Sequence, residues 1–174
     1  MKRINMIIIA MLLSLGAFAQ QQFDTDFTQT KLMKVSGKTT QKEGHLTFDG
    51  NDHLNMNYSV PEGEYFIIDG NKVKIKMDGK KRELDATNQK LVQLQRSTLL
   101  NCLSGNWEQA AADNNADITI TEEGGLKTVS IVARGKVPRG GYNSVKLTYR
   151  LSDGMLIEMV LEEAIGIQNT YQLK

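Results

Sequence analysis

Short stretches with an apolar residue at every second position dominate the chain between Gly44 and Leu84. Successive side chains of a strand point to opposite faces of a sheet, so this period predicts strands with one apolar and one polar face. The apolar residues of these strands are Leu46 and Phe48, then Leu54, Met56 and Tyr58, then Val73, Ile75 and Met77. The pattern therefore predicts an antiparallel meander with a continuous apolar face.

Asp-Gly sequences separate these predicted strands. They are Asp49-Gly50-Asn51-Asp52, Asp69-Gly70-Asn71 and Asp78-Gly79. Glycine adopts the positive φ of tight hairpin turns at no steric cost, and Asn and Asp tolerate it. Pairing Phe48 with Leu54 across the first turn keeps the apolar residues on one face and places His45 opposite Asn57.

After Leu84 the apolar residues recur every three or four positions, which predicts a helix. Asp85-Ala86-Thr87 offers a helix start, and Ser104-Gly105 ends the run. We expect about four turns from Asn88 to Leu103. A second, short helical turn is expected around Trp107.

The two-residue period then returns and continues to the end of the chain. Its apolar members are Ile118, Ile120, Val129, Ile131, Val145, Leu147, Tyr149, Leu151, Met155, Ile157, Met159, Leu161, Tyr171 and Leu173. With a first strand from Phe27 to Val35, the total is about eleven strands. The fold class predicted is mainly β with one or two helices, in a single domain over residues 20–174.

The first nineteen residues are typical of a cleaved export signal. Lys2 and Arg3 precede an apolar run from Met6 to Leu13, and small residues at Ala17 and Ala19 mark a cleavage site. An N-terminal membrane anchor is the alternative, but the run is much shorter than the ~20 residues that span a bilayer. Since no cysteine for acylation lies near the cut, we expect a soluble protein in the periplasm.

Charge and cysteine content exclude several partners. The chain has 21 basic and 20 acidic residues, and removing Lys2 and Arg3 leaves 21 − 2 = 19 basic ones. This balance argues against nucleic acid as a partner. The basic run Lys80-Lys81-Arg82 is read as a solvated strand edge, with a partner contact as the alternative. The single cysteine, Cys102, is expected to be a buried apolar residue.

No catalytic motif emerges, and we expect no enzyme, no cofactor and no metal site. His45 and His53 fall on the polar side of their strands without ligand spacing to other residues. The acidic pairs Glu122-Glu123 and Glu162-Glu163 are expected to be solvated, because neighbouring strand residues point to opposite faces. The Gly-rich loop from Arg134 to Asn143 lacks the residues of a phosphate-binding loop.

A curved sheet of about eleven strands encloses more volume than its own side chains fill, because closure near eight strands already leaves room for one ligand. One helix would cover such a sheet without filling it, so a cavity is expected. A packed core is the alternative. The residues expected to line the cavity are Leu46, Phe48, Leu54, Met56, Tyr58, Val73, Ile75, Met77, Leu147, Tyr149, Met155, Ile157 and Met159.

Several short motifs, in order, resemble the periplasmic lipoprotein carrier (LolA) family. They are Phe27-Thr28-Gln29, Gly44-His45-Leu46-Thr47-Phe48, Leu54 through Tyr58 leading to Pro61, and Phe66-Ile67-Ile68-Asp69-Gly70-Asn71, with Tyr171-Gln172-Leu173 at the end. The resemblance implies a half-open β-barrel with a helical lid and an apolar cavity. It further implies a monomer that carries lipoprotein acyl chains from an inner-membrane releasing complex to an outer-membrane acceptor.

The chain departs from this family at two places. Residues 20–26 are too few for the helix that often precedes the first strand, and Asp49-Gly50-Asn51-Asp52 stands where better-known carriers place an arginine that helps keep the lid closed. The alternative function is an envelope interaction or sensor module that uses the sheet edge or the Arg134 to Asn143 loop. A void far below ~300 Å³ would favour that alternative.

Overall fold

The computed structural model describes residues 21–174, and the predicted export signal, residues 1–19, lies outside the described residues. Eleven strands and two helices form this part of the chain. The strands are β1 (Phe23–Met33), β2 (Lys38–Phe48), β3 (His53–Val60), β4 (Glu62–Asp69), β5 (Lys72–Met77), β6 (Lys80–Asp85), β7 (Ala116–Glu123), β8 (Leu126–Ala133), β9 (Tyr142–Arg150), β10 (Leu156–Glu163) and β11 (Ile167–Leu173). The helices are α1 (Lys90–Leu103) and α2 (Trp107–Asp113).

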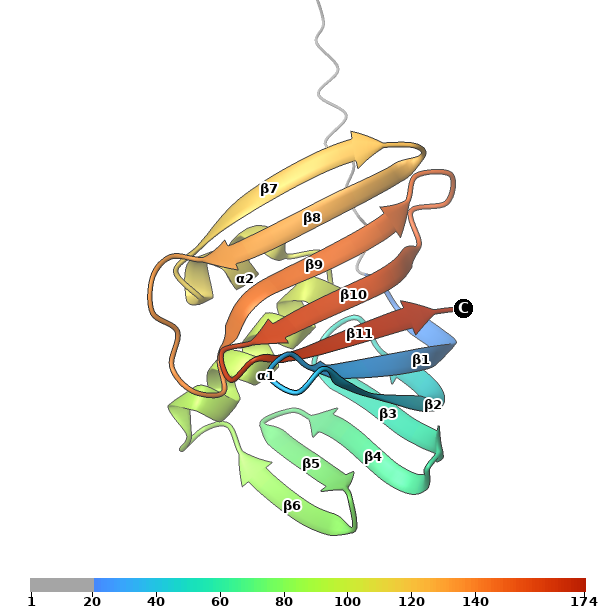
Figure 1. The fold of residues 1–174 in the computed structure, drawn as a ribbon, viewed down its shortest axis with the longest axis vertical. Helices are drawn as coiled ribbons and strands as arrows, with labels where there is room; N and C mark the ends of the chain where they lie inside the picture. The colour runs from blue at the N-terminus through green and yellow to red at the C-terminus, as the bar shows by residue number, and fades with distance from the viewer. Residues whose placement is uncertain (1–20) are drawn as a thin grey trace, which may run out of the picture.

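All eleven strands belong to one antiparallel sheet (Figure 1). Its order is β6-β5-β4-β3-β2-β1-β11-β10-β9-β8-β7. The first six strands form one meander and the last five another, and the pairing of β1 with β11 joins the two. The first and last strands of the described chain therefore lie side by side in the middle of the sheet.

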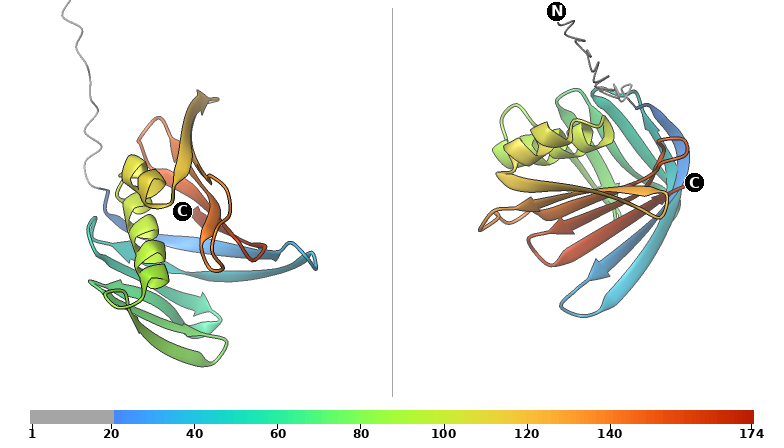
Figure 2. Two further views of the ribbon diagram at one scale, coloured as in Figure 1. Left: turned by 90° about the vertical axis from the view of Figure 1, so that its left-hand side faces the viewer. Right: turned by 90° about the horizontal axis from the view of Figure 1, so that it is seen from above.

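The sheet curls around the two helices, which lie on its concave face (Figure 2). The edge strands β6 and β7 do not pair with each other. The predicted fold class, a half-open antiparallel barrel of about eleven strands with a helical lid, is confirmed. Among residues 21–174, no helix is long and apolar enough to span a membrane.

Turn chemistry sets the register of the first meander as predicted. Phe48 pairs with Leu54, and His45 pairs with Asn57. At the β5–β6 turn Asp78 has φ 51° and Gly79 has φ 74°. Two consecutive residues with positive φ are the signature of the tight turn that matches the twist of its flanking strands.

Gly44 allows a close approach in the middle of the sheet. A Cβ at this position would lie 2.3 Å from the carbonyl oxygen of Asn57 and 2.8 Å from Cζ of Phe27. Because Phe27 pairs with Gly44, its ring lies over the space that a side chain would occupy. The ring meets Tyr58 edge-on at 5.3 Å between centroids.

Helix α1 begins two residues later than predicted, at Lys90. Asp85 does not cap the helix. It ends β6, and its carboxylate accepts a hydrogen bond from the backbone N–H of Thr87 at 2.9 Å. The last turns of α1 bury Leu99, Leu100, Cys102 and Leu103. Cys102 is fully buried, as predicted, and burial raises the pKa of its thiol to about 12.

Helix α2 covers the second meander near β7 and β8. Its Trp107 is buried, and the indole Nε1–H donates to the hydroxyl of Tyr149 at 3.0 Å. Pairing a buried indole with a buried phenol satisfies two polar groups inside an apolar layer. This end of the concave face is therefore packed core.

The predicted alternation at β10 is wrong at its start. Met155 precedes the strand and is 44% exposed, whereas Leu156 is 1% exposed. A register shift between Leu156 and Glu158 lies in the pairing of β10 with β9. A bulge of this kind inserts one residue and resets which face the next side chains occupy. Ile157 is accordingly only half-buried.

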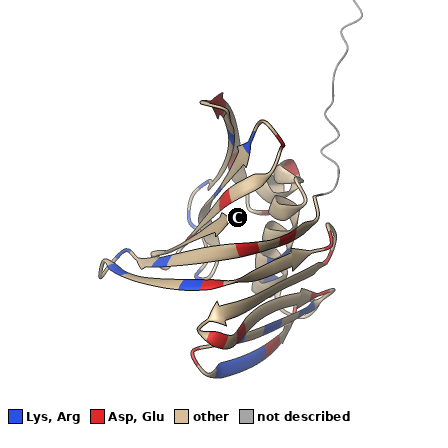
Figure 3. Cartoon of the chain, turned by 90° about the vertical axis from the view of Figure 1, so that its right-hand side faces the viewer, with Lys and Arg blue, Asp and Glu red and all other residues tan. Residues whose placement is uncertain are grey.

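Strand β6 is one edge of the sheet, and Lys80, Lys81 and Arg82 are exposed on it. Figure 3 shows Lys and Arg segments in blue along the lowest strands of the sheet, where the first meander ends. Charged side chains on an edge strand discourage pairing with another chain. The prediction of a solvated strand edge for this basic run is confirmed.

Candidate functional site

A cavity of about 280 Å³ lies between the concave face of the sheet and α1. Strands β1 to β6 and β9 to β11 contribute to it, so it extends across the junction of the two meanders. Its lining residues are Gln29, Lys31, Lys42, Met56, Tyr58, Phe66, Val73, Ile75, Met77, Asp78, Leu84, Val92, Gln95, Arg96, Leu99, Tyr142, Met159, Leu161, Glu163, Asn169 and Tyr171.

Apolar side chains form one part of the cavity wall. The sheet side carries Met56, Phe66, Val73, Ile75, Met77, Leu84, Met159 and Leu161, and the helix side carries Val92 and Leu99. Three of these residues are methionines, whose unbranched side chains adapt to ligands of irregular shape. An apolar wall of this composition suits a hydrocarbon chain.

A relay of polar side chains lies on the β1, β10 and β11 side of the cavity. Gln29 Nε2 donates to Oδ1 of Asn169 at 2.9 Å, and Asn169 Nδ2 donates to Oε1 of Glu163 at 2.9 Å. Gln29 and Asn169 are each 8% exposed. Burial raises the pKa of Glu163, against the opposing influence of Lys31 and of the Asn169 hydrogen bond.

A second polar group is the ion pair of Lys42 with Glu64. The lysine contacts the carboxylate directly, and the other carboxylate oxygen accepts from the backbone N–H of Asp78 at 2.7 Å. Burial alone would raise the pKa of Glu64, but these two hydrogen bonds outweigh it and lower the pKa. Glu64 is therefore held as a carboxylate beside the cavity.

Three tyrosines complete this polar side. Tyr58, Tyr142 and Tyr171 all line the same cavity. Burial is the largest cause that holds the pKa of all three hydroxyls above the usual range. They stay neutral at physiological pH, so their rings act as apolar surface with a hydroxyl at the tip.

Helix α1 is attached to the sheet and to the β8–β9 loop by polar contacts. Arg96 Nε donates to the carbonyl of Gly70 in the β4–β5 turn at 2.5 Å. Gln95 donates to the carbonyl of Gly140, so the Gly-rich loop packs against α1. Both side chains also line the cavity. The helix that covers the cavity is therefore attached to two separate segments, the β4–β5 turn and the β8–β9 loop.

The structure divides the predicted lining residues into three groups. The cavity brings together Met56, Tyr58, Val73, Ile75, Met77 and Met159. The second group, Leu46, Phe48, Leu54, Leu147 and Tyr149, is buried in the packed core away from the cavity. Met155 and Ile157 form the third group and do not reach the cavity because of the β10 bulge.

Sequence reasoning missed both the helix side and the polar side of the cavity. Val92 and Leu99 carry the helical period that predicted α1, but that period does not say which residues face a void. Glu163 was expected to be solvated, and it lines the cavity instead. Its position at two-residue spacing after Met159 and Leu161 is the signal that places it on the concave face.

Two wider hollows of about 470 Å³ each are open depressions on the surface. The lining of one includes Phe48, Asp49, His53, Leu54 and Asp69, and the lining of the other includes His45. Their linings mix charged and apolar side chains. An open, mixed depression removes little of a ligand from water, so the smaller cavity under α1 is the better binding site.

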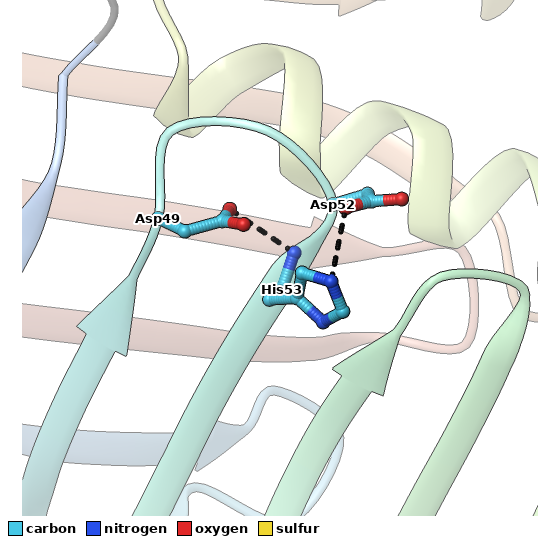
Figure 4. Close-up of side chains that lie close together, drawn as sticks. All are labelled: Asp49, Asp52 and His53. Atoms are coloured by element: carbon cyan, nitrogen blue, oxygen red, sulfur yellow. Dashed lines mark hydrogen bonds and ion pairs between the residues drawn. The ribbon is translucent and has the colours of Figure 1, made fainter.

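The side chains of Asp49, Asp52 and His53 lie close together, with possible metal-ligand atoms within 4.8 Å of one another (Figure 4). The Asp49 carboxylate is already used by the turn, because it accepts from the backbone N–H of Asn51 at 2.8 Å and of His53 at 3.1 Å. Burial opposes these bonds, which still lower the pKa of Asp49. This arrangement is a β2–β3 turn stabilised by its own aspartate.

The convex face carries the other histidine. His45 lies between two carboxylates of β1, with Nδ1 2.8 Å from Asp26 and Nε2 2.8 Å from Asp24. The hydrogen bond with Asp26, followed by that with Asp24, raises the pKa of His45. It lies on the polar side of β2, as predicted.

Comparison with known proteins gives one family. Residues 19–174 match the model of a family described as outer membrane lipoprotein carrier protein LolA. No curated protein sequence matches the chain.

Solved structures similar to this chain share little sequence with it. A LolA superfamily protein from Nitrosomonas europaea has 10% identity and a TM-score of 0.40, over 89% of this chain and 84% of that one. The MucA/MucB complex of Pseudomonas aeruginosa gives 12% and 0.40, over 90% and 51%. LprF from Mycobacterium bovis gives 13% and 0.35, over 90% and 86%.

Proposed function

The chain belongs to the LolA family, and from this premise we propose that it is a periplasmic carrier. It binds acyl chains of lipoproteins, or of other lipids, in the cavity under α1 and moves them toward the outer membrane. Residues 1–19 act as its export signal, and residues 20–174 form the single carrier domain. It works as a monomer between an inner-membrane releasing complex and an outer-membrane acceptor, without catalysis.

The cavity under α1 is the observation that carries this proposal. Its volume of about 280 Å³ is near the lower end of ordinary ligand sites, roughly 300 Å³. This void is not far below that limit, so it gives no preference to an interaction module with a vestigial cavity. The Gly-rich loop, which such a module would use for contacts, packs on α1 through Gln95.

The energetics of chain burial suit reversible transport. Transfer of an acyl chain of about fourteen methylenes from water into an apolar site is worth roughly 11 kcal/mol as an upper figure, at ~0.8 kcal/mol per CH₂. The small cavity takes up part of this chain unless α1 moves outward. Incomplete burial lowers the affinity, which helps a carrier to release its cargo.

The direct test is to purify the protein from cells that express the full chain and to extract it with organic solvent. Mass spectrometry of the extract should detect bound lipid or lipopeptide. The stripped protein should also bind a fluorescent fatty acid. Absence of extracted lipid together with absence of fatty-acid binding would refute the proposal.

A cavity-filling substitution tests whether the cavity is the site. Ile75 is half-buried on the cavity wall, so Ile75→Trp should lower fatty-acid affinity by about tenfold or more, because the indole occupies the space of several methylenes. Val132→Trp is the matched control, since Val132 is 52% exposed on β8. Unchanged binding by folded Ile75→Trp would place the site elsewhere.

A further inference from the structure

The relay of Gln29, Asn169 and Glu163 has a single direction when Glu163 is ionised. An ionised carboxylate has no proton to donate, so Glu163 accepts from Asn169 Nδ2 at 2.9 Å. Asn169 Oδ1 therefore faces Gln29 and accepts a hydrogen bond from Gln29 Nε2. The amide oxygen of Gln29 is left at the end of the relay as an acceptor.

This oxygen has no hydrogen-bond partner among residues 21–174. Gln21 and Asn55 also have an unpartnered buried oxygen, but only Gln29 of the three lines the cavity. A buried acceptor without a donor costs about 1–3 kcal/mol. A ligand that brings an N–H group to this position removes that cost, whereas a ligand without a donor leaves it.

We propose that Gln29 Oε1 is the head-group acceptor of the cavity and selects acyl chains that carry an amide N–H. This inference rests on the proposed function, since it names the chemistry of the ligand at the same site. The hydrocarbon chain lies along the aliphatic wall of Met56, Ile75 and Leu99. The amide that ends the chain lies beside Gln29, at the junction of β1 and β11.

Two other head groups fit this side of the cavity less well. An ester head group has no N–H or O–H group that could donate a hydrogen bond to Gln29 Oε1. A free fatty acid brings a carboxylate to the side of the cavity where Glu163 also lies, and like charges in a site of low polarity repel each other strongly. Three cations on the cavity lining, Lys31, Lys42 and Arg96, would favour the acid.

The experiment compares two probes that differ by one methyl group. N-methyldodecanamide carries an amide N–H, and N,N-dimethyldodecanamide has the same chain and carbonyl without it. Each displaces a fluorescent fatty acid from the stripped protein. We expect the N–H probe to bind about tenfold more tightly. Dodecanoic acid and methyl dodecanoate are measured alongside.

A substitution tests whether Gln29 causes the preference for the N–H probe. Gln29→Met keeps the length of the side chain and removes the acceptor, so the ratio of the two affinities should fall to about one while the dimethyl probe binds as before. Gln41→Met is the matched control, because Gln41 is exposed on β2 and its substitution should leave the ratio unchanged.

The possible results separate this inference from the proposed function. Equal binding of both amides to the unsubstituted protein overturns the inference and leaves acyl-chain binding intact. A preference for dodecanoic acid overturns it in favour of recognition by the cations of the cavity lining. Binding of none of the four probes overturns both. Because the unsubstituted protein alone gives these results, the test stands even if Gln29→Met does not fold.

Discussion

Single residues set the polarity of the two faces of the sheet. On the concave face, Gln29 and Glu163 place polar atoms on the lining of the cavity. On the convex face, His45 bridges Asp24 and Asp26 of the neighbouring strand. Both features include residues of β1, which lies in the middle of the sheet. The residues of β1 therefore serve the cavity and the sheet at once.

The histidine bridge predicts a pH dependence of stability. Because the two aspartates raise the pKa of His45 in the folded state, the bridge stabilises fully below the unfolded pKa of about 6.5 and loses this effect as pH rises through the higher folded pKa. The loss of stability in His45→Gln should thus be larger at pH 5 than at pH 8. Since His45 is about half exposed, the difference is below about 1 kcal/mol.

Urea unfolding at a series of pH values measures this difference. Asp26→Asn serves as the control, because it removes the largest cause of the raised pKa of His45 and should weaken the pH dependence. A loss in His45→Gln that stays constant from pH 5 to pH 8 would show that the bridge does not depend on a charged imidazole.

At the scale of elements, α1 forms one side of the cavity. Its Val92 and Leu99 form the helix side of the wall, and its Gln95 and Arg96 attach it to the Gly140 loop and the β4–β5 turn. The N-cap residue of the helix, Gln89, makes no side-chain capping hydrogen bond. The contacts of Gln95 and Arg96 therefore add to the apolar packing of Leu99, Leu100 and Leu103 in holding α1 on the sheet.

Removal of the Arg96 contact should loosen α1. Arg96→Met keeps the aliphatic part of the side chain and deletes a hydrogen bond from a charged donor, worth about 1.5–3 kcal/mol. We expect faster hydrogen exchange in residues 90–103 and faster release of bound fatty acid. Arg150→Met, which breaks an exposed ion pair with Asp153, should change neither. Unaltered exchange in α1 would contradict this role of Arg96.

The spacing of apolar residues along the sequence predicted many of the individual elements of this fold. The period of two predicted the strands of both meanders, and the period of three to four predicted α1 within two residues of its start. The bulge in β10 was not predicted, because Met155, Leu156 and Ile157 are all apolar and either register satisfies a two-residue period. Pairing with β9 selects the register that buries Leu156.

At the scale of the whole molecule, the sheet is too wide for its two helices to fill. The far end of the concave face is packed by α2 and the last turns of α1, where Trp107 meets Tyr149. The remaining part, under the first turns of α1, is the cavity. Its aliphatic wall and its polar side together match an amphiphilic ligand. The hydrocarbon chain of such a ligand contacts the aliphatic wall, and its head group contacts the polar side.

If the proposed function is correct, ligand binding should stabilise the whole domain. A fatty acid at one hundred times its Kd adds about 2.7 kcal/mol to the free energy of unfolding, which raises Tm by roughly 5–10 °C for a domain of this size. Differential scanning fluorimetry measures the shift. Ile75→Trp should unfold in one transition yet show little shift, and an equal shift in both proteins would indicate binding outside the cavity.

The sequence by itself determined the elements and their apolar faces, because the periods of strands and helices depend on neighbours a few residues apart. It also carried the motifs that indicated the family. Only the tertiary structure decided which apolar residues face a void and which are packed core. That distinction depends on the pairing of β1 with β11, almost the length of the described chain apart, and on where α1 lies on the sheet. Glu163, Asn169 and Gln29 form one relay for the same reason.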